Sequence, residues 1–213
     1  MYRFRWRQVL AAAAVTATAA LATMTGYSAA TAAQPQQQLV WSGTNLWQNV
    51  GSESKSIAKC DRDMVMVGRS HDGDENGPSA VRCTFLRTSS GRGGPIVRTS
   101  GTTKSEWIKE SSGRAFTCPT NSVMSLRLHV NDENGDTQYR CQSLELFRGD
   151  DEKEHPVITS DVVWSGSVKE ANSSYTCPEN KVLVGREHTG DENGSTRYQC
   201  AALQVAATGG ASR

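Results

Sequence analysis

The sequence has almost no excess of charge of either sign. It contains 23 Lys and Arg against 22 Asp and Glu, a formal net charge of +1 at pH 7, and the two kinds of residue are interspersed. A chain that binds nucleic acid or an anionic membrane surface through long-range electrostatics needs a basic excess. The composition therefore indicates neither a nucleic-acid partner nor a charged membrane surface.

Helical periodicity and aromatic residues are also scarce. Aromatic residues make up 7% of the chain. After residue 33, no window longer than about ten residues places its apolar side chains with a period of 3.6, so we expect almost no helix. The short, mostly apolar, valine-containing runs 64–67, 123–126 and 182–184 predict strands instead.

The N-terminus has the pattern of a secretory signal peptide. Arg3, Arg5 and Arg7 precede a small-residue apolar run over 9–24, and the alanine-rich stretch 29–33 follows. The run is shorter than the roughly 20 strongly apolar residues that a membrane span needs. We predict that residues 1–33 are a signal peptide cleaved after Ala32 or Ala33. Since no second apolar run follows, 34–213 is predicted to be one mature, secreted domain without membrane insertion.

Six cysteines form three pairs with the same spacing, and each pair encloses a similar sequence. The period is near 60 residues, which is typical of a structural unit used three times. We place the three repeats at 39–88, 95–148 and 157–207. In an exported chain, cysteines predict disulfides. One bond per repeat predicts three pairs: Cys60 with Cys83, Cys118 with Cys141 and Cys177 with Cys200. Each would close a loop of about 24 residues and add roughly 3 kcal/mol of stability.

About four strands are expected in each repeat. The first is predicted to end in a turn at a Ser-Gly pair, which is Ser42-Gly43, Ser100-Gly101 or Ser165-Gly166. The second leads into the first Cys, and the third and fourth form a hairpin. The expected fold is all-β, with three pseudo-symmetric repeats, one disulfide in each, arranged as a β-trefoil or a β-prism.

The most regular feature is a polar loop between the third and fourth strands. An Arg, a His and the sequence Asp-Glu-Asn-Gly stand at identical offsets in all three repeats. One interpretation is structural: Asn-Gly is a strong hairpin-turn signal, Asp caps the turn, and Arg pairs with an acid. The other is a polar binding pocket repeated three times, whose candidate ligand-binding residues are Arg69, His71, Asp74, Asn76, Arg127, His129, Asp132, Asn134, Arg186, His188, Asp191 and Asn193.

Metal binding and catalysis receive less support. The stretch 72–77 matches the first half of an EF-hand loop, but its twelfth place is Cys83, which excludes an EF-hand. A looser calcium site, or a zinc site formed by the three His, stays open as an alternative. The chain has neither a Gly-x-Ser-x-Gly nor a His-Glu-x-x-His motif. Because binding sites are often multiplied for avidity, we predict a protein that is not an enzyme, with no metal and no cofactor.

Four tryptophans follow the predicted signal peptide. Trp41 and Trp164 stand in similar Trp-Ser-Gly contexts, so we expect them at equivalent places in the core. Trp47 and Trp107 lie in variable polar stretches and are candidates for exposed contact surfaces.

The segment from Cys177 through Gly185 and His188 to Tyr198 and Cys200 resembles the dermatopontin family, extracellular proteins with repeated disulfide-closed loops. At the position of the aromatic Tyr198 the first repeat has Val81, and at the position of Gly185 the second repeat has Leu126. The family's Asp-Arg-x-Trp signature is replaced by Asp-Glu-Asn-Gly. The resemblance covers about 24 residues in each repeat, and it implies an adhesive protein that binds matrix or sugar and lacks enzymatic activity.

These observations predict a secreted, lectin-like binding protein that is monomeric or weakly associating. Its partner would be a cell-surface or cell-wall glycan held by the recurring loops. The alternative is an adapter in a secreted multi-protein assembly, such as an antibacterial toxin particle, or a secreted inhibitor that binds a partner protein.

Overall fold

The computed structural model describes residues 37–61, 63–74, 76–89, 96–132, 134–147, 154–191 and 193–207. All of them belong to the compact unit Gln34–Arg213. The predicted signal peptide, 1–33, lies outside the described residues. No helix in the described ranges is long and apolar enough to cross a membrane.

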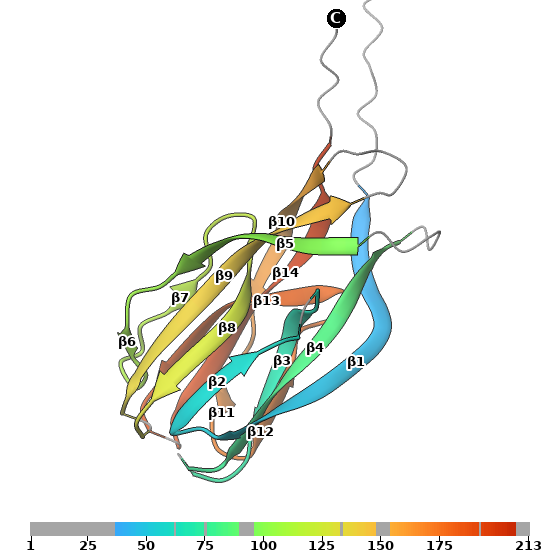
Figure 1. Cartoon of the computed structure of the whole chain (residues 1–213). Coiled ribbons are helices and arrows are strands. Elements are labelled where there is room, and N and C mark those ends of the chain that lie inside the picture. The colour runs from blue at the N-terminus through green and yellow to red at the C-terminus, as the bar shows by residue number, and fades with distance from the viewer. Residues whose placement is uncertain are drawn as a thin grey trace, which may run out of the picture. The chain divides into compact units, whose positions relative to one another are not determined.

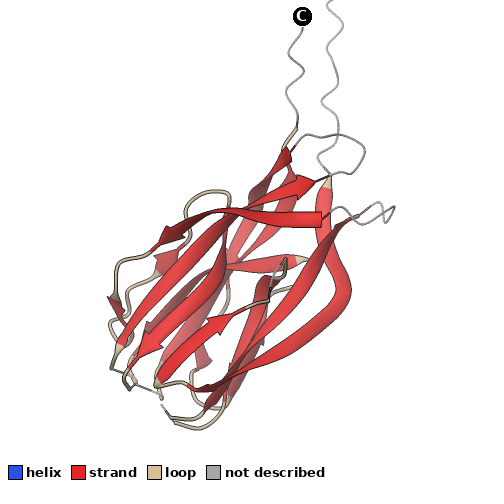
Figure 2. Cartoon of the chain, viewed as in Figure 1, coloured by secondary structure: helices blue, strands red, loops and turns tan. Residues whose placement is uncertain are grey.

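All regular elements of the described residues are strands (Figure 2). The first repeat contains β1 (Gln38–Ser52), β2 (Lys55–Lys59), β3 (Val65–His71) and β4 (Pro78–Thr88). The second contains β5 (Ile96–Lys104), β6 (Ile108–Lys109), β7 (Phe116–Thr117), β8 (Ser122–Val130) and β9 (Asp136–Phe147). The third contains β10 (Glu154–Trp164), β11 (Val168–Lys169), β12 (Ser173–Thr176), β13 (Lys181–Thr189) and β14 (Ser195–Val205). The all-β prediction is therefore confirmed.

Within each repeat, the third and fourth strands form an antiparallel hairpin. These hairpins are β3–β4, β8–β9 and β13–β14, and the closing cysteines Cys83, Cys141 and Cys200 lie opposite Met66, Met124 and Leu183. A register shift follows directly after each of these pairs. The first strand of each repeat lies on the other side of the fourth, in the pairs β1–β4, β5–β9 and β10–β14.

The second strand of each repeat pairs with the hairpin of another repeat. β2 lies against β8, β7 against β13, and β12 against β3, all antiparallel (Figure 1). Further pairings, β1 with β14 and β10 with β9, join the strands of the described ranges into one hydrogen-bonded network of fourteen. The expected trefoil-like or prism-like division stays a prediction.

Two of the three expected Ser-Gly turns are bulges inside a strand. β1 continues through Ser42-Gly43 to Ser52, and β5 continues through Ser100-Gly101 to Lys104, with register shifts at both places. Gly43 and Gly101 have φ of 94° and 59°, a backbone conformation that glycine adopts without a steric penalty and that suits a bulge. Only in the third repeat does the strand end before Ser165-Gly166, so the prediction was wrong for the other two.

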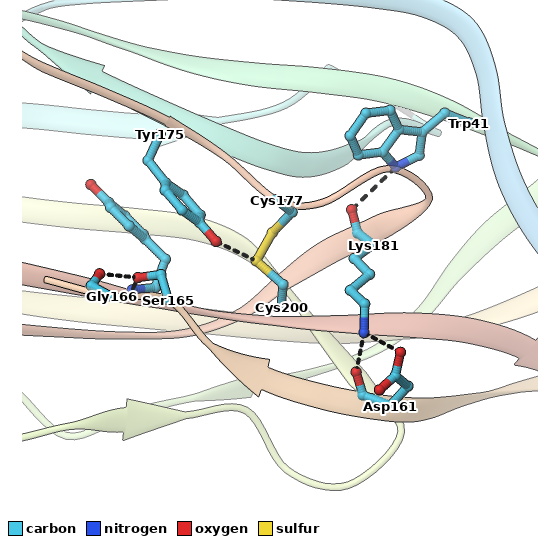
Figure 3. Close-up of a disulfide and its surroundings, with 9 residues drawn as sticks. Trp41, Asp161, Ser165, Gly166, Tyr175, Cys177, Lys181 and Cys200 are labelled. Carbon is cyan, nitrogen blue, oxygen red and sulfur yellow. Dashed lines mark hydrogen bonds and ion pairs between the residues drawn. A yellow bond between two sulfur atoms is a disulfide. The ribbon is translucent and has the colours of Figure 1, made fainter. Parts of the chain in front are cut away.

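The interior contains two apolar clusters. One is aliphatic and includes the fully buried Leu39, Val67 and Leu146. The other surrounds the disulfides, which join Cys60 to Cys83, Cys118 to Cys141 and Cys177 to Cys200 as predicted. Two pairs of stacked rings belong to this cluster: Phe116 on Tyr139 and Tyr175 on Tyr198, with centroids 4.6 Å apart in each pair. Figure 3 shows the Tyr175 hydroxyl directed at the Cys200 sulfur, 3.4 Å away.

Candidate functional site

A closed circuit of six charged side chains lies in the interior at the base of the three recurring turns. Each of three arginines forms ion pairs with two glutamates, and each glutamate with two arginines. In order around the circuit, the residues are Glu53, Arg127, Glu110, Arg186, Glu170 and Arg69. Their side chains are only 2–8% exposed. Because every arginine joins glutamates from two different repeats, the circuit links all three repeats.

The strands place these groups in the same way in each repeat. The arginines stand at one position of the third strand, in β3, β8 and β13. Each glutamate follows directly or closely after β1, β6 or β11 and donates its backbone N–H to the glycine of its own repeat's Asp-Glu-Asn-Gly turn. The acceptors are Gly77 at 3.1 Å, Gly135 at 2.9 Å and Gly194 at 3.0 Å. The turn thus holds the backbone from which the glutamate reaches the circuit.

Opposite charges at short range keep the buried carboxyl groups ionised. Burial raises the pKa of Glu53, but the guanidinium groups of Arg127 and Arg69 outweigh burial and hold the pKa well below its ordinary value. The pKa of Glu170 is likewise lowered, since Arg69 more than offsets burial. Burial and then the charge of Arg69 lower the pKa of Arg186 to about 10, so it is still cationic at neutral pH. Glu53 and Glu170 are therefore carboxylates that pair with guanidinium groups of the circuit.

The histidines form a second layer between the circuit and the turns. His71, His129 and His188 are 1–4% exposed. Each donates from Nε2 to a backbone carbonyl of its turn: Asp74 at 2.8 Å, Asp132 at 2.9 Å and Gly190 at 3.0 Å.

On the other side of the ring, Nδ1 of His129 and His188 contacts the hydroxyls of Thr137 and Thr196, both at 2.8 Å. The same hydroxyls also contact the carboxylates of Glu110 and Glu170. Burial, followed by the neighbouring Arg127 or Arg186, lowers the pKa of His129 and His188 to about 4. Both rings are therefore neutral at pH 7.

The aspartate and glycine of each turn have structural roles. Oδ1 of Asp74, Asp132 and Asp191 accepts the N–H of the asparagine two positions later, at 3.2, 3.1 and 2.9 Å. This is an Asx-type cap. A Cβ on Gly77, Gly135 or Gly194 would lie only 1.7–1.9 Å from a backbone oxygen across the turn, so no larger residue fits. The structural interpretation of these positions is thus supported by direct contacts.

The structure separates the predicted site residues into two groups. The arginines and histidines lie in the interior, whereas the aspartates and asparagines are exposed at the turn tips. The four residues of a repeat therefore do not line one open pocket. Ligand binding stays a prediction, and its accessible part is limited to the three exposed tips: Asp74 with Asn76, Asp132 with Asn134, and Asp191 with Asn193.

Sequence reasoning missed Glu53, Glu110 and Glu170, which complete the circuit. Two similar tripeptides, Ile108-Lys109-Glu110 and Val168-Lys169-Glu170, could have indicated that these glutamates are equivalent. In the first repeat, a register shift between Asn49 and Gly51 adds a residue, so the corresponding stretch is Val50-Gly51-Ser52-Glu53. That bulge hid the equivalence.

Two further features complete the site. A small cavity of about 10 Å³ lies between the three circuit arginines and the apolar side chains Met66, Met124 and Leu183. Among the described residues, no group of three or more His, Cys, Asp or Glu is arranged to hold a metal ion.

The tryptophans do not pair up as the sequence predicted. Trp47 and Trp164, not Trp41, share a register position, opposite Arg82 and Gln199 next to the closing cysteines. Each lies near a guanidinium group, with Arg82 5.9 Å from the Trp47 ring and Arg197 5.3 Å from that of Trp164. The extra residues of the bulge after Trp41 shift the register. Trp41 packs against the core, whereas Trp47 and Trp107 are 42% and 46% exposed, as expected.

Comparison of the chain with protein-family models, with curated proteins and with solved structures finds no match. The dermatopontin resemblance stays an expectation that concerns only the segments between paired cysteines.

Proposed function

We propose that this protein is a secreted, non-enzymatic, lectin-like binding protein that engages cell-surface or cell-wall glycans through its three turn tips. The observation that carries the proposal is the threefold presence of one turn whose Asp and Asn are exposed. Each tip exposes a carboxylate and a carboxamide, the groups that hydrogen-bond sugar hydroxyls. Repeated weak sites on one chain gain avidity for a surface that repeats its own ligand.

The buried circuit supports the proposal by fixing the tips relative to one another. Its ion pairs join adjacent repeats, and the histidines tie each turn to the same layer. Binding groups on a preorganised scaffold lose less conformational entropy when a ligand is bound. The interior histidines and arginines thus act as positioning residues, and the exposed aspartates and asparagines as the contact residues.

We also infer that the three repeats are related by an approximate threefold axis, in a prism-like arrangement. Each hairpin has its own first strand on one side and a strand from another repeat on the other, as in β1–β4–β3–β12. The cyclic order of the ion pairs agrees with this inference. The three disulfides are compatible with an extracellular protein, and with the N-terminal pattern they favour secretion.

Glycan-array binding of the secreted protein tests the proposal, with two triple variants at Asp74, Asp132 and Asp191. Replacement by Asn keeps the Oδ1 cap and removes the charge, whereas replacement by Ala removes both. We expect at least a tenfold loss of glycan binding in the Asn triple variant, with an unchanged melting temperature. Binding that survives in both variants would refute the assignment of the tips.

A second candidate function, an adapter in a secreted assembly or an inhibitor of a partner protein, has its own support. Leu46 and Trp47 on β1 and Phe85 on the neighbouring β4 are 41–47% exposed. Exposed apolar groups of this kind are typical of protein contact surfaces. A stoichiometric protein that co-purifies from culture medium and is lost in Trp47→Ala, together with no glycan affinity, would favour this function.

A further inference from the structure

One of the three junctions between repeats differs from the other two. In the closed junctions, the residue three positions after the first cysteine is an asparagine that accepts a backbone N–H from the next repeat. Asn121 accepts from Thr159 at 3.1 Å, and Asn180 accepts from Trp41 at 3.0 Å. In Figure 3, the Trp41 indole also donates to the Lys181 carbonyl at 3.1 Å, which closes that junction further.

The corresponding residue at the junction of the first and second repeats is Asp63. It has the same left-handed backbone, with φ of 64° against 61° for Asn121 and Asn180. Among the described residues, however, no hydrogen bond or ion pair engages its carboxylate. The backbone bonds that join Cys118 to Val184 and Cys177 to Val67, each 2.8 Å, also have no counterpart from Cys60 to Ser125 in the described ranges.

One side chain at the crossing of the strands also differs at this junction. The other two junctions have Gly68 and Gly185, where a Cβ would lie 2.5 Å and 2.6 Å from the carbonyl oxygens of Tyr175 and Phe116 on the crossing strand. The second repeat has Leu126 at this position. β2 still pairs with β8 in the register of its counterparts, with Lys59 opposite Leu126, so the room that the Leu126 side chain needs is local to this pair. Cys60 is half-buried, whereas Cys118 and Cys177 are buried.

A cavity of about 280 Å³ occupies the space beside Leu126. This volume is close to the lower end of the roughly 300–1,000 Å³ range of small-molecule sites. The first repeat contributes Asp63, Lys59 and Asp61, whose carboxylate accepts a hydrogen bond from Gln48 Nε2 at 2.8 Å. The second contributes Thr102, Arg140 and Gln142. Two acids and two bases thus surround one cavity.

These charged side chains do not form ion pairs with one another. None of the ion pairs of the described residues includes Lys59, Asp63 or Arg140, and the buried Nε of Arg140 has no hydrogen-bond partner. A ligand with a cationic and an anionic group satisfies both sets, since ammonium pairs with carboxylate and carboxylate with guanidinium. We propose that the open junction is a binding site for a sugar-sized zwitterion. The choice of a sugar rests on the proposed glycan function; the charge pattern does not.

The test is isothermal titration of the secreted protein with four sugars that differ in charge. Muramic acid has an ammonium and a carboxylate, glucosamine only the first, glucuronic acid only the second, and glucose neither. We expect muramic acid to bind at least tenfold more tightly than each of the others.

Three variants assign the site. Asp63→Asn introduces the residue that the other two repeats carry, and should weaken muramic acid and glucosamine while leaving glucuronic acid unchanged. Arg140→Gln should weaken muramic acid and glucuronic acid while leaving glucosamine unchanged. Leu126→Gly removes an apolar wall of the cavity and should weaken muramic acid binding, at a cost in thermal stability because glycine is unfavourable inside a strand. Asp136→Asn, an exposed charge change away from the cavity, is the matched control.

Equal affinity for all four sugars, no binding, or muramic acid binding unaffected by Asp63→Asn and Arg140→Gln would overturn the proposal. The triple turn-tip variants should keep muramic acid binding. Loss of glycan binding at the turn tips and loss of muramic acid binding in the cavity can therefore be told apart.

Discussion

Arg69 and Glu170 stand 101 positions apart in the sequence and form a buried ion pair. This contact joins the first repeat to the third, and with the other pairs of the circuit it couples each repeat to both of the others. Isolated buried ion pairs contribute little net stability because desolvation offsets their attraction. Their use here is better explained by specificity, because each arginine needs glutamates from two different repeats.

Removing one member of the circuit should destabilise the fold strongly. Glu170→Ala leaves Arg69 and Arg186 each without one of their two carboxylate partners in the interior. The expected loss in the free energy of unfolding is roughly 3–5 kcal/mol, measured by urea denaturation. The matched control is Glu187→Ala, which removes the partially exposed pair with Arg197. It should cost less than about 1 kcal/mol. Equal costs for the two variants would contradict the role of the circuit.

Stability should fall as the pH decreases from about 6.5 to 4. The pKa values of His129 and His188 are lowered from 6.5 to about 4, so the unfolded chain binds more protons than the folded chain in this range. Each histidine contributes a slope of up to about 1.4 kcal/mol per pH unit. The lowered pKa values of Glu53 and Glu170 act in the same direction, because their stabilisation is lost as the pH falls through the folded-state values.

Urea unfolding at pH 7, 5.5 and 4.5 measures this dependence. His129→Gln removes one titrating group, and the slope with pH, rather than the absolute stability, should decrease. A free energy of unfolding that is the same at pH 7 and pH 4.5 would show that these histidines do not stay neutral in the fold.

The turn glycines should not tolerate even one added methyl group. In Gly194→Ala, the new Cβ would lie 1.9 Å from the carbonyl oxygen of Thr189, so the backbone has to move. We expect a cost of about 1–3 kcal/mol or more. Gly166→Ala is the matched control, since nothing lies within 4 Å of its Cβ position. It should change the melting temperature little. Comparable losses in both variants would argue against close packing as the reason for the recurring glycine.

Features that depend on the local sequence pattern could be predicted. Features that depend on how distant strands pair could not. The all-β class, with almost no helix, and the three disulfide pairs follow from residue spacing and residue type. The described residues agree with these predictions. The described part of the chain has fourteen strands where the sequence predicted about twelve. The difference arises because the first strands of the second and third repeats are interrupted, which gives the short strands β6 and β11.

The buried glutamates could not be recognised by alignment of the repeats alone. Glu53 and Glu170 precede Cys60 and Cys177 by the same seven positions, but Glu110 precedes Cys118 by eight. A change of one residue in this spacing is typical of a variable loop, and only the ion pairs in the structure show that the three glutamates are equivalent. The exposed tips were predicted together with Arg and His as one pocket, because sequence spacing does not show that the strand residues Arg and His are buried whereas Asp and Asn belong to the exposed turn beyond the strand.

The number of glycan molecules bound per chain tests the central claim most directly. Titration calorimetry with a neutral oligosaccharide identified on the array should give three equivalent sites for the native protein and two for Asp191→Asn. The Asn triple variant should show none. One site per chain, or a stoichiometry unchanged by Asp191→Asn, would contradict the account that three equivalent turn tips bind the ligand.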